Sequence, residues 1–177
     1  MQAIHLLAVG GIPTGLLDRL SAGLARALRV SCRVEKAVLD PGFAVDTERG
    51  QYYSTAILAR LAATNPPPGH RILGVTLLDL YVPILTFVYG EAQISGPCAL
   101  VSAHRLREEY YGLPENSARC DQRLLIEALH ELGHTQGLRH CSDWSCAMAS
   151  SHSIESLDLK ETRYCDACAA KILMARV

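Results

Sequence analysis

The sequence predicts an α/β fold in which helices cover a mostly parallel β-sheet. Segments rich in Val, Ile and Leu alternate along the first half of the chain with segments whose leucines recur at helical spacing. The order strand, helix, strand, helix, strand implies right-handed crossovers, which place these strands parallel in one sheet. The chain has 177 residues, 49% of them hydrophobic, which suffices for a single domain with its own core.

Five elements are predicted in the first half of the chain. In order they are a strand at 3–9, a helix at 16–28, a strand from 32 to 38, a helix at 49–63 and a strand at 71–80. Asp40-Pro41-Gly42 ends the second strand, and the proline run at 65–69 ends the second helix. The segment RILGVTLLDL at 71–80 is apolar almost throughout, which indicates a central strand that is buried on both faces.

Four further elements are predicted in the second half. They are strands near 85–94 and 98–104, a helix at about 121–136 and a last helix near 159–175. The two strands are close enough in sequence to pair as hairpin neighbours. Asp158 followed by Glu161 fits a capping box at the start of the last helix.

Charge and hydropathy exclude several classes of protein. The formal net charge is −1, so no global field would recruit nucleic acid or an anionic membrane. No apolar run approaches the roughly 18 residues of a membrane span, and the N-terminal segment lacks the basic region of a signal peptide. We therefore expect a cytoplasmic protein that binds neither nucleic acid nor membranes.

The segment His130-Glu131-Leu132-Gly133-His134 has the pattern H-E-x-x-H on a predicted helix. Residues four apart lie on one helix face, so His130 and His134 can bind one metal ion. Glu131 is displaced by about 100° around the helix. It therefore borders the ion without having to bind it, which is the position of a general base that acts on a water molecule at the metal.

The pattern extends to H-E-x-x-H-x-x-G-x-x-H. Gly137 tolerates the positive φ that ends a helix sharply, so the chain can turn back and bring His140 to the same ion. Three neutral imidazoles leave a fourth position open for water, as in catalytic zinc sites. We expect His130, His134 and His140 to hold a catalytic zinc ion and Glu131 to be the base. For Glu127, one turn earlier, we expect a solvated or ion-paired carboxylate, with support of the metal site as the alternative.

Four of the seven cysteines cluster between residues 141 and 168, and an odd number of cysteines argues against a disulfide framework. Their spacing is C-x4-C, a gap, and then C-x-x-C. Four thiolates with no open position are typical of structural zinc sites. The sequence thus predicts a second, structural zinc ion, held by four ligands: Cys141, Cys146, Cys165 and Cys168.

The motif HELGHTQGLRHCSDWSCAM at 130–148, followed by YCDAC, resembles the archaemetzincin family, whose motif is H-E-x-x-H-x-x-G-x-x-H-C-x4-C-x-M with a final C-x-x-C. Further resemblance lies at Arg49-Gly50-Gln51-Tyr52, Asp79-Leu80-Tyr81, Phe87-Val88-Tyr89-Gly90-Glu91-Ala92 and Val101-Ser102.

This resemblance implies a metzincin-like fold with a mixed five-stranded sheet, an active-site helix and a small zinc-held C-terminal lobe. It implies one metallopeptidase domain over residues 1–177, with lobes at about 1–137 and 138–177. An antiparallel edge strand would run along the cleft, for which 85–94 is the candidate. Met148 would be the methionine of the Met-turn, an apolar floor beneath the histidines and not a ligand.

The sequence therefore predicts a zinc-dependent peptidase with two zinc ions, whose peptide or protein substrate binds along the strand near 85–94. Two alternatives remain open. One is a zinc-stabilised module that binds peptides or proteins with little catalysis. The other is a zinc hydrolase of non-peptide amides or esters, since the site selects a carbonyl and not specifically a peptide.

Overall fold

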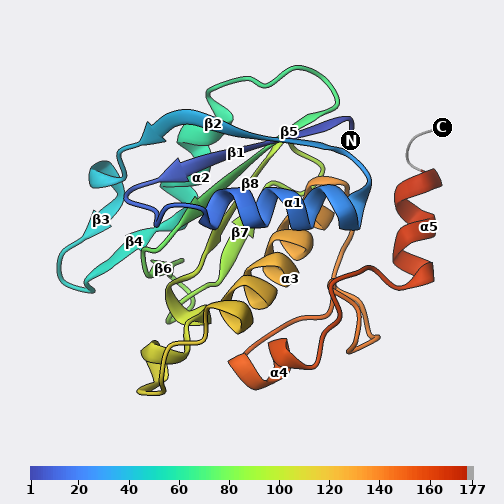
Figure 1. Cartoon of the computed structure of the whole chain (residues 1–177). Helices are drawn as coiled ribbons and strands as arrows, with labels where there is room; N and C mark the ends of the chain where they lie inside the picture. The colour runs from blue at the N-terminus through green and yellow to red at the C-terminus, as the bar shows by residue number, and fades with distance from the viewer. Residues whose placement is uncertain (175–177) are drawn as a thin grey trace.

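The computed structural model describes residues 1–174 and has a five-stranded sheet at its centre (Figure 1). The strands are β1 (Ala3–Val9), β2 (Ser31–Leu39), β5 (His70–Thr76), β7 (Gly90–Ala92) and β8 (Cys98–Ser102). Their order across the sheet is β2-β1-β5-β8-β7. The first three of these four pairings are parallel, and only β7 runs antiparallel, at the edge beside β8. The predicted mixed, mostly parallel five-stranded sheet is confirmed.

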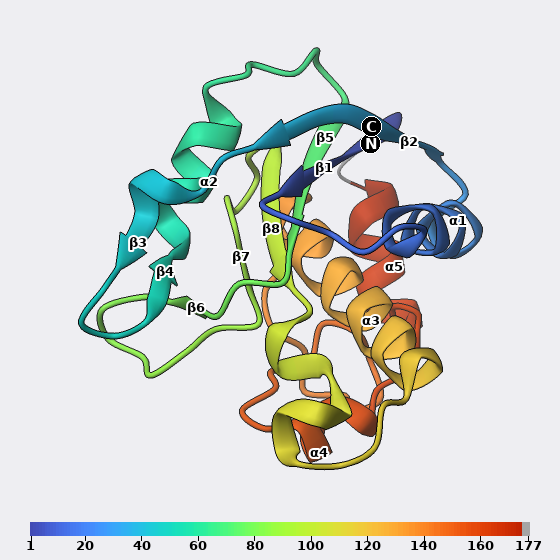
Figure 2. The same cartoon turned by 60° about the vertical axis from the view of Figure 1, so that its left-hand side comes forward.

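Helices cover both faces of this sheet (Figure 2). One face carries α1 (Leu16–Leu28) and α3 (Ser117–Thr135), and the other carries α2 (Ser54–Ala62). The strand β5 contributes Leu73 and Val75 to the core under α1 and α3, and Ile72 to the core under α2. Its burial on both faces agrees with its apolar sequence.

A second sheet of three short strands accounts for two wrong boundaries. It consists of β3 (Val45–Asp46), β4 (Gln51–Tyr53) and β6 (Leu80–Tyr81). The helix predicted at 49–63 begins only at Ser54, because the preceding residues pair with β6 as a strand. The strand predicted at 71–80 ends at Thr76. Pairing between distant segments overrides local helix preference here, and a local pattern does not contain that information.

The edge strand is shorter than predicted. Of the range 85–94, only Gly90–Ala92 pairs with β8, and residues 82–89 form a loop that is exposed at 83–86. Pro83 lies at the start of this loop, and proline lacks the amide hydrogen that a strand ladder needs. The strand predicted at 98–104 also ends early, at Ser102, before the 3-10 helix His104–Leu106. The helix α3 starts four residues before the predicted 121, where the Asn116 side chain caps it.

The last helix predicted at 159–175 is wrong. Two helices, α4 (Ile154–Asp158) and α5 (Asp166–Met174), are separated by an irregular segment, and position 175 lies outside the described residues. Lys160 and Cys165 both contact groups on the body of the protein, whereas on one straight helix they would point about 140° apart. Asp158 does not form the predicted helix cap and instead makes an ion pair with Arg123.

The capping box in this region belongs to α4 and consists of Ser153 and Ser156. No helix among residues 1–174 is both long and apolar enough to cross a membrane.

Candidate metal centre

The helix α3 and the turn that follows it bring three histidines together. The ring centroids of His130 and His134 are 4.7 Å apart, and each lies 5.2 Å from the ring of His140. The Nε2 atoms of His130 and His134 are 3.1 Å apart. Two nitrogens bound to one tetrahedral zinc ion at about 2.0 Å would be separated by about 3.3 Å, so the spacing fits such an ion closely.

Hydrogen bonds orient two of these imidazoles. Nδ1 of His130 donates to the carbonyl of Ala147 at 2.8 Å, and Nδ1 of His134 donates to the carbonyl of Leu138 at 2.8 Å. With Nδ1 used in this way, Nε2 presents a lone pair to the common point, as metal-binding histidines usually do. Burial lowers the pKa of His130 to about 3 and also lowers that of His140, so both rings stay neutral and available as ligands.

The turn after α3 depends on Gly137. Its φ is +84°, a left-handed conformation that favours glycine. The amide of Gly137 donates to the carbonyl of His134 at 2.9 Å, and that of Leu138 donates to Gly133 at 3.1 Å. These two bonds close the end of the helix. The chain reverses and carries His140 back to the other two histidines, as the spacing predicts.

Glu131 is buried beside the histidines and lines the same cleft, whose volume is about 590 Å³. Burial raises its pKa well above the ordinary value, and the neighbouring carboxylates of Glu127 and Glu91 raise it further. A Cβ atom on Gly90 would lie 2.8 Å from Oε1 of Glu131. The glycine in the edge strand β7 therefore makes room for this carboxylate at the bottom of the cleft.

Glu127 is paired with a lysine that the sequence analysis overlooked. Lys160 Nζ lies 3.6 Å from Oε1 of Glu127, and both side chains are buried. Lys160 also donates to the carbonyl of Ala147 at 3.5 Å, the same carbonyl that orients His130. The ion pair thus agrees with the expectation for Glu127. No signal marked Lys160, because its segment was predicted to be part of one continuous last helix.

The four clustered cysteines form a second group of atoms that could bind a metal ion, all within 4.8 Å of one another. The Sγ atoms of Cys141 and Cys165 are 3.8 Å apart, as expected for two thiolates on a tetrahedral zinc ion with Zn–S distances of about 2.3 Å. Amides of Met148 and Cys165 donate to Sγ of Cys146 at 3.4 and 3.2 Å. Burial raises the pKa of Cys146 and Cys168, whereas a hydrogen bond from the amide of Cys168 contributes most to lowering that of Cys165.

Met148 lies between the two groups. Its side chain is fully buried, and the backbone amide of Cys141 donates to its carbonyl oxygen at 2.9 Å. A Cβ atom on Gly133 would lie 2.3 Å from its Sδ atom. The sulfur therefore fits against the bare backbone of α3 between His130 and His134. The sequence analysis did not single out Gly133, although its position within the motif is the signal that could have found it.

Comparisons with known proteins identify the family of this chain. The model of peptidase family M54 matches residues 30–174. An archaemetzincin from Methanocaldococcus jannaschii is 44% identical over 141 residues, which cover 80% of this chain and 76% of the relative. One from Pyrococcus furiosus is 33% identical over 175 residues, 96% of this chain and 91% of the relative.

The solved structures lead to the same family. A zinc-dependent peptidase from Methanocorpusculum labreanum matches with a TM-score of 0.88 and 29% identity over 96% of this chain and 99% of that chain. The archaemetzincin of Archaeoglobus fulgidus matches with a TM-score of 0.82 and 31% identity over the same shares. The fold, the two groups of ligating side chains and these relatives together place the chain in peptidase family M54, as an archaemetzincin and hence a member of a zinc-dependent peptidase family.

Proposed function

We propose that the chain is a zinc metallopeptidase in which His130, His134 and His140 hold the catalytic ion and Glu131 is the general base. The observation that carries this proposal is the convergence of three imidazoles, two of them oriented through Nδ1, at a cleft whose floor is a buried carboxylate. When bound there, zinc would polarise a substrate carbonyl and make a water molecule more acidic.

The residues of this chain would divide the remaining work. Glu131 takes a proton from the attacking water and passes it to the leaving amine. Its raised pKa suits both steps, because the carboxyl can hold the proton between them. Met148 takes the Met-turn position of metzincins, as an apolar support beneath the histidines.

We propose that an extended peptide or protein substrate pairs with β7. This strand is the sheet edge, and all three of its residues, Gly90, Glu91 and Ala92, line the cleft that Glu131 also lines. Addition of a strand to a sheet edge is a common way to bind peptides, because main-chain hydrogen bonds hold the segment in register. Such pairing would lay a scissile bond across the histidines.

We also propose that Cys141, Cys146, Cys165 and Cys168 hold a structural zinc ion, which gives two zinc ions per chain. All seven thiols are free, and a protein that keeps a thiolate site reduced suits the cytoplasm. We therefore place the protein there.

The variant Glu131→Gln tests the catalytic assignment. Glutamine keeps the shape of the side chain but cannot move the proton, so peptide hydrolysis should fall by at least about 10²-fold with zinc content and melting temperature unchanged. Glu115→Gln, at an exposed position, is the matched control. Hydrolysis is measured on a proteome-derived peptide library.

The outcomes separate the alternatives. Activity that survives in a zinc-replete Glu131→Gln protein would show that Glu131 is not the base. Peptide binding by both proteins without cleavage by either would favour a zinc-stabilised binding module. Cleavage of small amides or esters with no cleavage of peptides would favour the non-peptide hydrolase.

A further inference from the structure

The loop at residues 82–89 forms one wall of the cleft. Leu85, Phe87 and Tyr89 line the same cavity as the histidines and Glu131. The loop has few main-chain hydrogen bonds: Leu85 donates to the carbonyl of Val82 at 3.0 Å, Val88 donates to that of Leu80 at 2.9 Å, and the carbonyl of Tyr89 accepts from Ser102 at 2.8 Å. Within residues 1–174, no main-chain donor reaches the carbonyls of Leu85 or Thr86.

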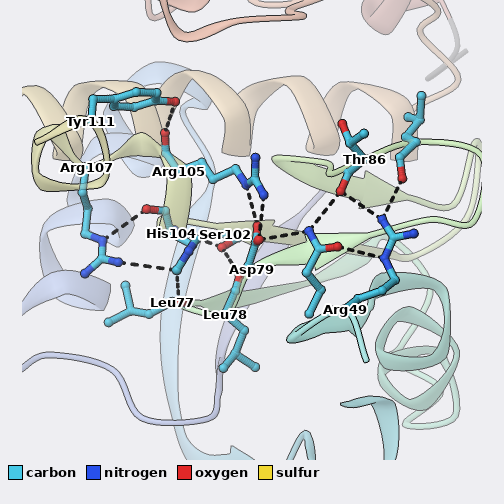
Figure 3. Close-up of polar contacts among 12 residues, drawn as sticks. Arg49, Leu77, Leu78, Asp79, Thr86, Ser102, His104, Arg105, Arg107 and Tyr111 are labelled. Atoms are coloured by element: carbon cyan, nitrogen blue, oxygen red, sulfur yellow. Dashed lines mark hydrogen bonds and ion pairs between the residues drawn. The ribbon is translucent and has the colours of Figure 1, made fainter. Parts of the chain in front are cut away.

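Two side chains from β4 and the turn before it bind those two carbonyls. Arg49 Nη2 donates to the carbonyl of Leu85 at 3.2 Å and to that of Thr86 at 3.1 Å. Gln51 Nε2 donates to the carbonyl of Thr86 at 3.0 Å. Figure 3 shows Arg49 reaching across to Thr86 from below the loop. The tip of the wall is thus fixed through its backbone by residues more than thirty positions earlier in the chain.

These two side chains are fixed in turn by an ion pair. Arg105 binds both oxygens of Asp79, at 2.7 and 2.8 Å, and Gln51 Nε2 donates to the same carboxylate at 2.9 Å. Gln51 Oε1 accepts from Arg49 Nε at 2.9 Å. Burial acts to raise the pKa of Asp79, but the hydrogen bonds from Arg105 and Gln51 outweigh it and hold the pKa below its ordinary value. Asp79 is therefore ionised and binds Arg105 and Gln51, and Gln51 in turn binds Arg49.

The same network also contacts Phe87, a side chain that lines the cleft. The guanidinium of Arg105 lies over the ring of Phe87, 4.2 Å from its centroid, and Phe87 packs edge-on against Tyr89 at 5.1 Å. Arg49 lies over the ring of Tyr81 at 4.2 Å. None of the network residues Arg49, Gln51, Asp79 and Arg105 lines the cleft itself.

We infer that Arg49, Gln51, Asp79 and Arg105 are positioning residues for the peptide substrate, which hold the 82–89 wall at a fixed distance from the metal centre. This inference rests on the proposed function and deepens it. A wall held through its main-chain carbonyls is ordered before the substrate arrives, so binding does not have to order it. Loss of the network should therefore weaken substrate binding and leave the chemical step intact.

Arg49→Met is the sharpest test. Methionine keeps an unbranched apolar stem against Tyr81 but cannot donate to the two carbonyls. For a peptide that the wild type cleaves, KM should rise roughly tenfold with kcat changed by less than about twofold. Zinc content should not change. Arg49→Lys, which keeps donors, should recover part of the loss.

Arg60→Met is the matched control, because Arg60 also lies over a ring, that of Phe43 at 4.4 Å, but contacts no carbonyl of the wall. Hydrogen exchange of residues 82–89 and binding of the same peptide to zinc-loaded Glu131→Gln, with and without Arg49→Met, give readouts that need no catalysis. Faster exchange and weaker binding that are specific to Arg49→Met support the inference.

Two results would overturn it: exchange in 82–89 unchanged by Arg49→Met, or a fall in kcat with KM unchanged. If the wild type cleaves no peptide, the proposed function fails by itself. Hydrogen exchange then still decides whether the network fixes the wall.

Discussion

The two groups of ligating side chains are adjacent in sequence at His140 and Cys141 but differ in how the chain builds them. His130 and His134 lie on one long helix that packs against the sheet. The cysteines lie on short irregular segments and on α5, around a small apolar cluster with Leu138, Met148 and Ile172. The histidine group opens onto the cleft, whereas each cysteine is buried or half-buried. Regular structure thus positions two of the three histidines, whereas we expect the cysteine segments to need the proposed structural zinc ion to hold them together.

The two groups should differ most in how much the loss of one of their side chains lowers the stability of the fold. Cys165→Ser removes a ligand of the proposed structural zinc ion. Loss of a structural metal is one of the few changes that lower the free energy of unfolding by more than about 4 kcal/mol. The melting temperature should fall by roughly 10 °C or more. His134→Ala should change it far less, because α3 is supported by its packing on the sheet.

Both variants are melted after mild chelation, so that zinc bound to the histidines does not contribute to stability. If His134→Ala proved the less stable of the two, the structural and catalytic assignments would have to be exchanged.

The two groups should also differ in how tightly they hold zinc, which can be measured on the unmutated protein. The untreated protein, produced with zinc, should contain about two zinc ions, and mild chelation should remove about one of them, since a closed four-thiolate site holds its ion tightly. Metal analysis and activity are followed together. A single ion in the untreated protein would contradict the two-site proposal.

The subtlest difference concerns protons. Burial raises the pKa of Cys146 and Cys168, so these thiols are protonated at neutral pH in the metal-free protein and must lose their protons to bind zinc. His130, whose pKa is lowered to about 3, is already neutral. Zinc binding at the cysteines should therefore release about two or more protons and strengthen as pH rises.

Binding of zinc at the histidines should release fewer protons and depend less on pH, because burial lowers the pKa of both His130 and His140. Calorimetry in buffers of different ionisation enthalpy measures the number of protons released when zinc binds at each site. The histidine site is measured on protein that retains its tightly bound ion, and the cysteine site on metal-free His134→Ala. Equal proton release at the two sites would argue against this difference in their environments.

The sequence predicted one of these groups more completely than the other. The helix of His130 and His134 follows from periodicity and spacing, and Gly137 marks the turn to His140. The four cysteines were found by counting, but the path between them was not. The expected continuous last helix is broken at 159–165, where Lys160 reaches Glu127, a contact that no local pattern encodes.

The sheet shows the same limit. Apolar segments identified all five central strands, and the edge strand was placed in the right region. The small sheet was missed because Tyr52 pairs with Leu80, a residue from a distant segment. Strands of two or three residues have too little periodicity to be recognised from sequence, and their existence depends on the partner.

The anchoring of the cleft wall has a consequence for how such a protein can change over time. Arg49 and Gln51 bind the carbonyls of Leu85 and Thr86, and every amino acid offers a carbonyl, whatever its side chain. Residues at the tip of the wall can therefore be replaced without losing the anchor. Mutations can therefore change the side chains of the wall without moving its backbone. Substrate preference can diversify at exposed positions such as Leu85 while the residues that anchor the wall stay the same.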